Sequence, residues 1–98
     1  MGQVQHNQAA NRYKVEVGDK TAVAEYRRAG HVVTFTHTKV SRELEGQGIA
    51  SDLIAGALAD VRNQGLKIIP ECQYVTSYIE RHLDLQDFVM KSRLIHSP

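Results

Sequence analysis

Two glycines separated by one residue, Gly46 and Gly48, stand between a threonine-rich strand pattern and a long helical pattern, in the segment EGQGIA (residues 45–50). The first backbone N–H groups of a helix have no partner inside the helix, and the helix dipole adds partial positive charge there. Glycine lets the backbone approach an anion closely and adopt a positive φ. The junction therefore predicts a main-chain phosphate site, or else a tight turn that binds nothing. No Gly-Lys-Ser/Thr follows the glycines, so the turn is not a P-loop. The sequence also lacks the third glycine and the distal acid of a dinucleotide-binding fingerprint, so that motif is excluded as well.

The single cysteine, Cys72, lies between a short apolar run and a helical pattern, so it is expected at a helix N-terminus. That position favours the nucleophilic thiolate, although Glu71 opposes it, and the alternative is a small buried hydrophobe. His37 lies near the end of a strand pattern, on the face of Val33 and Phe35. Because histidine exchanges a proton near neutral pH, His37 is a candidate general base or a group that orients Cys72. The alternative is a strand-end histidine whose hydrogen bonds are satisfied within the fold.

Three strand patterns and one short apolar run must position these groups. Alternation of apolar and polar residues, as in Tyr13, Val15 and Val17, is typical of half-buried strands. Short connections predict that the three strands form an antiparallel meander, over residues 12–17, 21–27 and 31–38. The apolar run at 66–69 predicts a buried strand, parallel to an earlier one because it follows a crossover helix.

Two further stretches have apolar residues at helical spacing. They predict helices over residues 48–64 and 73–82, with Gly65 as a stop signal for the first. Gly56 inside the first helix costs about 1 kcal/mol relative to alanine, so it is expected to mark a close approach of helix and sheet. A short last element over 84–90 has no assigned type. The predicted fold class is α+β, or mixed α/β, in the order β-β-β-α-β-α with a short C-terminal element.

Length and composition exclude several classes of protein. The 98 residues suffice for one domain, expected at residues 12–98 behind a flexible tail of residues 1–11 that lacks the features of a secretory signal. A net charge of +1 predicts neither a nucleic-acid partner nor an acidic membrane surface. No apolar run reaches the roughly 18 residues of a membrane span. One cysteine excludes an internal disulfide and favours a cytoplasmic location, and no metal-ligand spacing occurs, so no metal is expected.

Three segments, in order, resemble one family. The stretch EGQGIASDLIAGAL resembles motif A of the GCN5-related N-acetyltransferases, Gln/Arg-x-x-Gly-x-Gly/Ala, followed by its long helix. The later stretch IIPECQYVTSYIERHLDLQDFV is similar to the signature Cys-Pro-Phe-Val-x-x-Tyr-Ile-x-Arg-His-Pro-Glu-Tyr-x-Asp-Leu-Val of a small, single-domain bacterial-type subfamily. The stretch THTKV resembles the His-Thr-Glu-Val of that subfamily, and the resemblance covers residues 12–90.

The resemblance implies acetyl-CoA as the cofactor and an amine as the acceptor. The turn would hold the pyrophosphate through main-chain N–H groups, and the strands at 31–38 and 66–69 would splay so that the pantetheine arm pairs with a strand end. The acetyl carbonyl would accept a hydrogen bond from a backbone N–H near Val40. Tyr78 would act as general acid toward the departing thiolate, the alternative being a core tyrosine with its hydroxyl at the rim. The implied coenzyme-binding residues are Thr38, Val40, Glu45, Gly46, Gln47, Gly48, Ile49 and Ala50.

Some positions depart from the family pattern. Glu45 replaces the family's Gln or Arg, and a solvated carboxylate beside a pyrophosphate is repulsive by about 1 kcal/mol, which predicts weaker binding rather than none. Gln73 replaces the proline after the cysteine, at a position expected to serve packing. Only the Gly18-Asp19 turn stands where larger relatives carry helices that form the acceptor pocket. The acceptor side is therefore expected to be open to a large or protein substrate.

The sequence thus predicts an N-acetyltransferase that passes acetyl from acetyl-CoA to an unidentified amine, by direct attack or through acetyl-Cys72. An acetyl-CoA-binding module without turnover is the alternative. A structural domain in which the turn serves only folding is a third hypothesis. The protein is expected to be a monomer or a weak homodimer.

Overall fold

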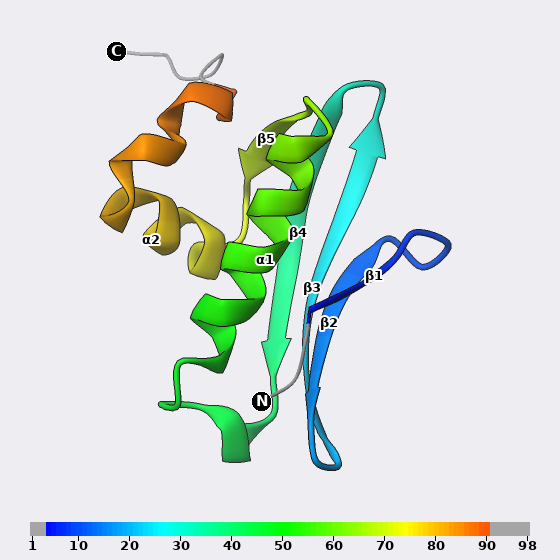
Figure 1. The fold of residues 1–98 in the computed structure, drawn as a ribbon, viewed down its shortest axis with the longest axis vertical. Helices are drawn as coiled ribbons and strands as arrows, with labels where there is room; N and C mark the ends of the chain where they lie inside the picture. Colours follow the sequence, from blue (N-terminus) through cyan, green and yellow to red (C-terminus); the bar gives the residue numbers. More distant parts are fainter. Residues whose placement is uncertain (1–3, 91–98) are drawn as a thin grey trace.

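The computed structural model describes residues 4–90, which form a five-stranded sheet and two α-helices. The strands lie side by side in the order β1-β2-β3-β4-β5 (Figure 1). The pairs β1–β2, β2–β3 and β3–β4 are antiparallel, and β5 runs parallel to β4. The mixed α+β class expected from the sequence is confirmed. The strands are β1 (Gln5–Asn7), β2 (Arg12–Val17), β3 (Lys20–Ala29), β4 (Val32–Val40) and β5 (Lys67–Pro70).

Both helices lie on one side of the sheet, where α1 (Ile49–Asn63) crosses β2 to β5 and α2 (Gln73–Arg81) packs beside α1 near β5 (Figure 1). The amphipathic pattern of α1 explains its position, because its apolar side chains are buried against the sheet. Two short 3₁₀ helices, η1 (Arg42–Leu44) and η2 (Leu83–Phe88), precede α1 and follow α2. The element of unassigned type is therefore η2. The buried residues of α1 are Ile49, Leu53, Ile54, Ala57, Leu58 and Val61.

A β-bulge in β4 changes which of its side chains face the helices. Tyr26 of β3 pairs with Phe35, but Glu25 pairs with His37, so Thr36 is an extra residue on β4. Cross-strand partners share a face of the sheet, and Phe35 therefore lies on the buried face with Tyr26. Beyond the bulge, the buried face passes to the even-numbered residues, and Thr38 pairs with the buried Ala24.

The sheet opens between β4 and β5. Their parallel ladder ends at the pair Phe35 and Pro70, and the Glu71 N–H donates to the Phe35 carbonyl at 3.1 Å. Strand β4 continues for another five residues to Val40, and no described residue of β5 pairs with that part. This divergence is the one that the resemblance implied. It leaves one edge of the β4 end available for hydrogen bonding.

The N-terminal segment corrects one expectation. A flexible tail was expected up to residue 11, but Gln5–Asn7 forms β1, which pairs with β2. His6 stacks on Tyr13 with ring centroids 4.1 Å apart, and its Nδ1 lies 3.3 Å from Asp60 Oδ2 of α1. These contacts, rather than any alternating pattern, hold β1 in place. Residues 1–3 of the expected tail and residues 91–98 of the expected domain lie outside the described residues.

The glycine inside α1 accommodates this same segment. A Cβ built on Gly56 would lie 2.7 Å from Val4 Cγ2, closer than real side chains come. The close approach expected at Gly56 is therefore made by the chain leading into β1 and not by the face of the sheet. Val4 packs against the core from this position.

Candidate functional site

The glycine turn, residues 45–50, connects η1 to α1. Gly46 has φ +83° and Gly48, the N-cap of α1, has φ +78°, a left-handed conformation that favours glycine. A Cβ built on either glycine would meet no atom within 4 Å, so the backbone conformation requires these glycines and crowding within the chain does not. The first helical bond runs from the Asp52 N–H to the Gly48 carbonyl at 3.0 Å. No side chain caps Gly48, and the N–H groups at 49–51 precede that first bond, so they are oriented for an external acceptor.

The turn borders a cavity of about 330 Å³. Glu45 is the one charged side chain among the described residues that line it, and Glu45 is exposed. Gln47 does not line the cavity, because its side-chain Nε2 donates to the Glu43 carbonyl at 2.7 Å and closes the turn. The expected coenzyme-binding residues Val40, Glu45, Gly46, Gly48, Ile49 and Ala50 line this cavity, together with Leu44, Ser51 and Tyr74.

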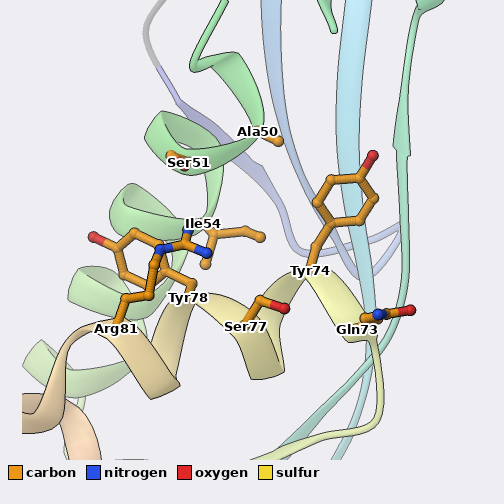
Figure 2. A pocket seen from close by; sticks show the side chains of 8 residues that line it. All are labelled: Ala50, Ser51, Ile54, Gln73, Tyr74, Ser77, Tyr78 and Arg81. Atoms are coloured by element: carbon orange, nitrogen blue, oxygen red, sulfur yellow. The ribbon is translucent and has the colours of Figure 1, made fainter. Parts of the chain in front are cut away.

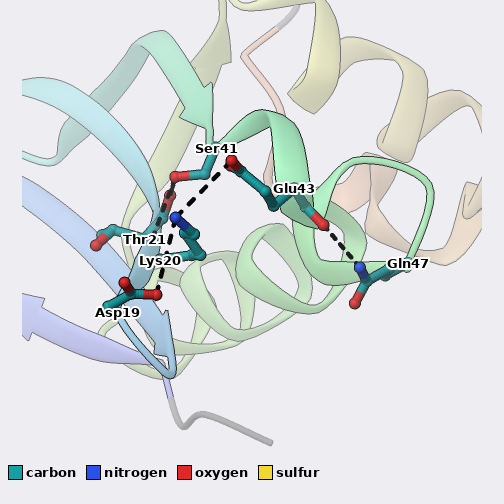
Figure 3. A network of polar contacts seen from close by, with 6 residues as sticks. All are labelled: Asp19, Lys20, Thr21, Ser41, Glu43 and Gln47. Atoms are coloured by element: carbon teal, nitrogen blue, oxygen red, sulfur yellow. Dashed lines mark hydrogen bonds and ion pairs between the residues drawn. The ribbon is translucent and has the colours of Figure 1, made fainter.

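A polar network ties this region to the β2–β3 hairpin (Figure 3). The Ser41 hydroxyl donates to the Thr21 carbonyl at 3.0 Å and accepts the Thr21 N–H at 3.3 Å. Lys20 Nζ lies 3.8 Å from a carboxylate oxygen of Asp19 and 3.8 Å from one of Glu43. These exposed ion pairs contribute little stability, and Lys20 is not among the residues that line the cavity at the turn.

Cys72 is the N-cap of α2, as expected, and it is 7% exposed. Its thiol donates a hydrogen bond to Thr38 Oγ1 at 3.0 Å, across the opening between β4 and the start of α2. The bulge makes this contact possible, because it places Thr38 on the buried face. The structure therefore joins Cys72 with Thr38, one of the expected coenzyme-binding residues.

The placement expected for His37 is wrong. It was expected on the face of Val33 and Phe35, but the bulge pairs it with Glu25 on the opposite face of the sheet, where it is exposed. The sheet therefore separates His37 from Cys72, and His37 is not in position to orient the thiol. If the side chains alternated along the whole of β4, His37 would share the face of Val33 and Phe35, as expected. The sequence carries no clear signal of the extra residue that breaks this alternation.

A second cavity of about 490 Å³ lies between the start of α1 and α2, and is called here the α1–α2 groove (Figure 2). It adjoins the glycine-turn cavity, since Ala50, Ser51 and Tyr74 line both. Tyr74 is 43% exposed, and Figure 2 shows its hydroxyl on the side of Ala50. The other residues that line the groove are Ile54, Gln73, Ser77, Tyr78 and Arg81.

Tyr78 lies in the α1–α2 groove and not in the glycine-turn cavity. Its ring stacks on His82 with centroids 4.0 Å apart, and the His82 Nδ1–H donates to the Tyr78 carbonyl at 2.8 Å. Sequence reasoning did not select Tyr74 or Arg81 for binding. The spacing of residues 74, 78 and 81, which puts them on one face of a helix, is the signal that could have found them.

Two other observations bear on the class of protein. Within residues 4–90, no group of three His, Cys, Asp or Glu side chains is arranged to hold a metal ion. None of the helices in this part of the chain is long and apolar enough to span a membrane.

The element order, with an open turn before the crossover helix and a parallel fifth strand after it, defines a small mixed α+β domain whose sheet opens beside the turn. A family model described as GCN5-related N-acetyl-transferase matches residues 12–88, and the chain belongs to that family. The solution structure of a GCN5-like protein from Staphylococcus aureus is similar, with a TM-score of 0.69 and 24% identity over 97% of this chain and 96% of that chain. At this identity the likeness shows the fold. Membership suggests an acetyltransferase, and acetyl-CoA is the typical ligand of this family, while the finer subfamily signature stays a prediction.

Proposed function

We propose that this protein binds acetyl-CoA and transfers its acetyl group directly to an amine. The observation that carries the proposal is the position of the glycine turn at the end of β4, beside the strand edge that β5 leaves free. A diphosphate needs several donors in a concave main chain, and the pantetheine amides need an unpaired strand edge. The two requirements meet at one end of the sheet.

The residues of the turn fit a diphosphate. The space in which a Cβ of Gly46 or Gly48 would stand is open, so an anion can approach the backbone there. The N–H groups at 49–51 and the α1 dipole supply the attraction. Glu45 opposes it, but this carboxylate is exposed and solvated, so its effect is about 1 kcal/mol.

The reaction needs few groups. The amine nitrogen uses its lone pair to form a bond to the acetyl carbon, the carbon–sulfur bond breaks, and the coenzyme leaves as a thiolate with that electron pair. The nitrogen loses one proton and the thiolate gains one, so atoms and charge balance. A backbone N–H near Val40 would donate to the carbonyl oxygen as negative charge develops on it.

Direct attack is preferred to a route through acetyl-Cys72. The Cys72 thiol is 7% exposed and is engaged as a hydrogen-bond donor to Thr38. A nucleophilic sulfur must reach the carbonyl carbon of the thioester, and a side chain this little exposed gives it little access. The contact with Thr38 instead suits a residue that fixes the start of α2 against β4.

Tyr78 was expected to be the general acid that protonates the departing thiolate. Tyr78 follows Cys72 by six residues, about 9 Å of helix rise, and it faces the α1–α2 groove. This position favours proton uptake by the thiolate from water on the open acceptor side. Tyr78→Phe tests the point: turnover that stays within about twofold supports water, whereas a hundredfold loss at unchanged affinity supports the phenol.

A binding module without turnover is the second candidate. It is favoured by the residues that line the two cavities, since Glu45 is their one carboxylate and no described histidine lines either cavity. For turnover, an amine acceptor would have to arrive unprotonated from solution, because these cavities offer it no histidine as a base.

Three measurements on one preparation test these proposals. An amide NMR titration with acetyl-CoA is expected to shift Gly46, Gly48 and Ala50, and unmoved amides at saturation would refute binding at the turn. Thiol release with a panel of amines distinguishes the enzyme from the module. Intact mass after incubation is expected to show no acetyl on Cys72, and Cys72→Ala is expected to keep turnover, as is the exposed control His37→Ala.

A further inference from the structure

The face of the sheet opposite the two helices carries a row of positive side chains. Both helices lie on the other side of the sheet (Figure 1). Val23 of β3 has two lysines as cross-strand partners, Lys14 of β2 and Lys39 of β4. Partners share a face of the sheet and adjacent strands are about 4.8 Å apart, so the backbones of the two lysines lie roughly 10 Å apart on the face without helices.

The positive charge of this face is not balanced by its own carboxylates. The two carboxylates that point to it from β2 and β3 each lie beside a cation of the same face. Arg27 and Lys39 are exposed, and no ion pair within residues 4–90 includes either of them. The two paired carboxylates are Glu25, 4.0 Å from Arg12, and Glu16, 3.2 Å from Lys14. The surface is called here the basic face: Arg12, Lys14, Val23, Arg27 and Lys39.

The opening between β4 and β5 is accessible from the basic face. On the helix side, the Cys72 thiol donates to Thr38 Oγ1 at 3.0 Å across the opening, and Cys72 is 7% exposed. Lys39 follows Thr38 on β4, and successive side chains of a strand point to opposite faces. A thioester held along the free edge of β4 can therefore be reached by an amine from the side of Lys39.

The two unpaired cations are too far apart for one small amine. Arg27 follows Val23 by four residues of β3, about 13 Å, and Lys39 lies one strand beyond Val23. An extended chain of about four or five residues covers this distance. Carboxylates suit the face better than a run of phosphates, because Glu16 and Glu25 interrupt its positive charge and repel a continuous polyanion.

We propose that the basic face docks the acceptor of the acetyl group, and that this acceptor is a polypeptide with carboxylate side chains close to its amine. This inference rests on the proposed function and deepens it, because it names the class of amine. Arg27 and Lys39 attract the carboxylates and direct the amine toward the opening. Exposed ion pairs are weak, which suits a substrate that must leave after each turnover.

The test uses the full chain saturated with acetyl-CoA and two hexapeptides that have free amino termini. One peptide carries Asp and Glu side chains, and the other carries Asn and Gln in their place. By thiol release, kcat/KM is expected to be about fivefold higher for the acidic peptide, the value of two exposed ion pairs, and added salt should reduce this advantage. Amide shifts measure docking independently of turnover, and the acidic peptide is expected to shift Val23 and Lys39.

Substitutions then assign the effect to the basic face. Arg27→Gln and Lys39→Gln are each expected to reduce the preference for the acidic peptide to about twofold, whereas Lys39→Arg should keep it. Arg28→Gln is the matched control, because it removes the same charge from the next residue of β3. Arg28 pairs with Val33, which is buried on the helix side, and its substitution is expected to leave the preference unchanged.

The outcomes separate this inference from the proposed function. Equal docking of the two peptides, an equal loss in Arg28→Gln, or a single-stranded hexanucleotide that displaces the acidic peptide overturns the acidic polypeptide as acceptor. Shifts at the glycine turn with acetyl-CoA would still support coenzyme binding in each of these cases. Unmoved amides at the turn refute the proposed function and the inference together.

Discussion

Substitution of Gly48 by alanine separates the role of the glycine turn in binding from its role in folding. Gly48 has φ +78°, and an alanine forced into the left-handed region costs roughly 1–2 kcal/mol. The added methyl group meets no atom of the protein within 4 Å, so no clash within the chain is added to this cost. The methyl group stands instead in the space through which a diphosphate would approach the N–H groups of α1.

Gly30 provides a control with the same backbone cost. It has φ +60° in the hairpin between β3 and β4, and a Cβ built on it also meets nothing within 4 Å. Gly48→Ala and Gly30→Ala are therefore expected to lower Tm by similar amounts, roughly 4–8 °C for each kcal/mol in a domain of this size. Thermal denaturation followed by circular dichroism measures both.

Affinity for acetyl-CoA should distinguish the two variants. Loss of a single hydrogen bond to a charged group weakens binding roughly tenfold or more, and Gly48→Ala is expected to lose at least one. Gly30→Ala is expected to bind like the wild-type protein in the same calorimetric titration. Equal affinities of the two variants would show that the turn is a folding element and that the coenzyme binds elsewhere.

Three further predictions concern charge, the N-terminal segment and pH. Glu45→Gln is expected to raise the affinity for acetyl-CoA about fivefold, the equivalent of 1 kcal/mol of relieved repulsion, whereas Glu16→Gln on β2 should change it little; equal effects in a titration would contradict the role given to Glu45. Gly56→Ala is expected to displace Val4 and speed amide exchange in β1, and Val4→Ala in the same chain should restore slow exchange; protected amides in Gly56→Ala alone would refute the contact. Tyr13 donates to the Asp60 carboxylate at 2.6 Å, and burial, with that carboxylate, raises the pKa of Tyr13 above its ordinary value of 10.0. The unfolded chain therefore ionises first, and the free energy of unfolding falls as the pH rises above that value. Tyr13→Phe should reduce this slope in urea titrations and cost about 1 kcal/mol at neutral pH.

The regular elements could be predicted because their buried faces follow fixed periods. The alternation of Tyr13 and Val15 and the helical spacing of Leu53, Ala57 and Val61 are strong local signals, and the corresponding strands and helix are present. The observed ends of the elements differ from the predicted ends by three residues or fewer, which is expected where caps and hairpin pairing extend an element. The order of elements then restricted the topology, since a strand after a crossover helix must lie parallel to an earlier one.

Strand β1 could not be predicted in this way, because it depends on contacts distant in sequence. Three residues are too few to show a period, and His6 is held by Tyr13 and Asp60. Gly56 predicted a close contact with α1 but not the residue that makes it. It indicated that something comes close to α1, but only the fold shows that the neighbour is Val4.

The candidate site shows a second limit, which follows from the physics of the strand itself. Side chains alternate along β4 until one extra residue reverses the alternation, and that single event moves His37 away from Cys72 and brings Thr38 to it. Glycine and helix signals survive such an insertion because they depend on local backbone geometry. Pairings between side chains of different elements do not survive it, since they depend on every residue of the register. The turn could therefore be located from the sequence, whereas the partner of the thiol required the fold.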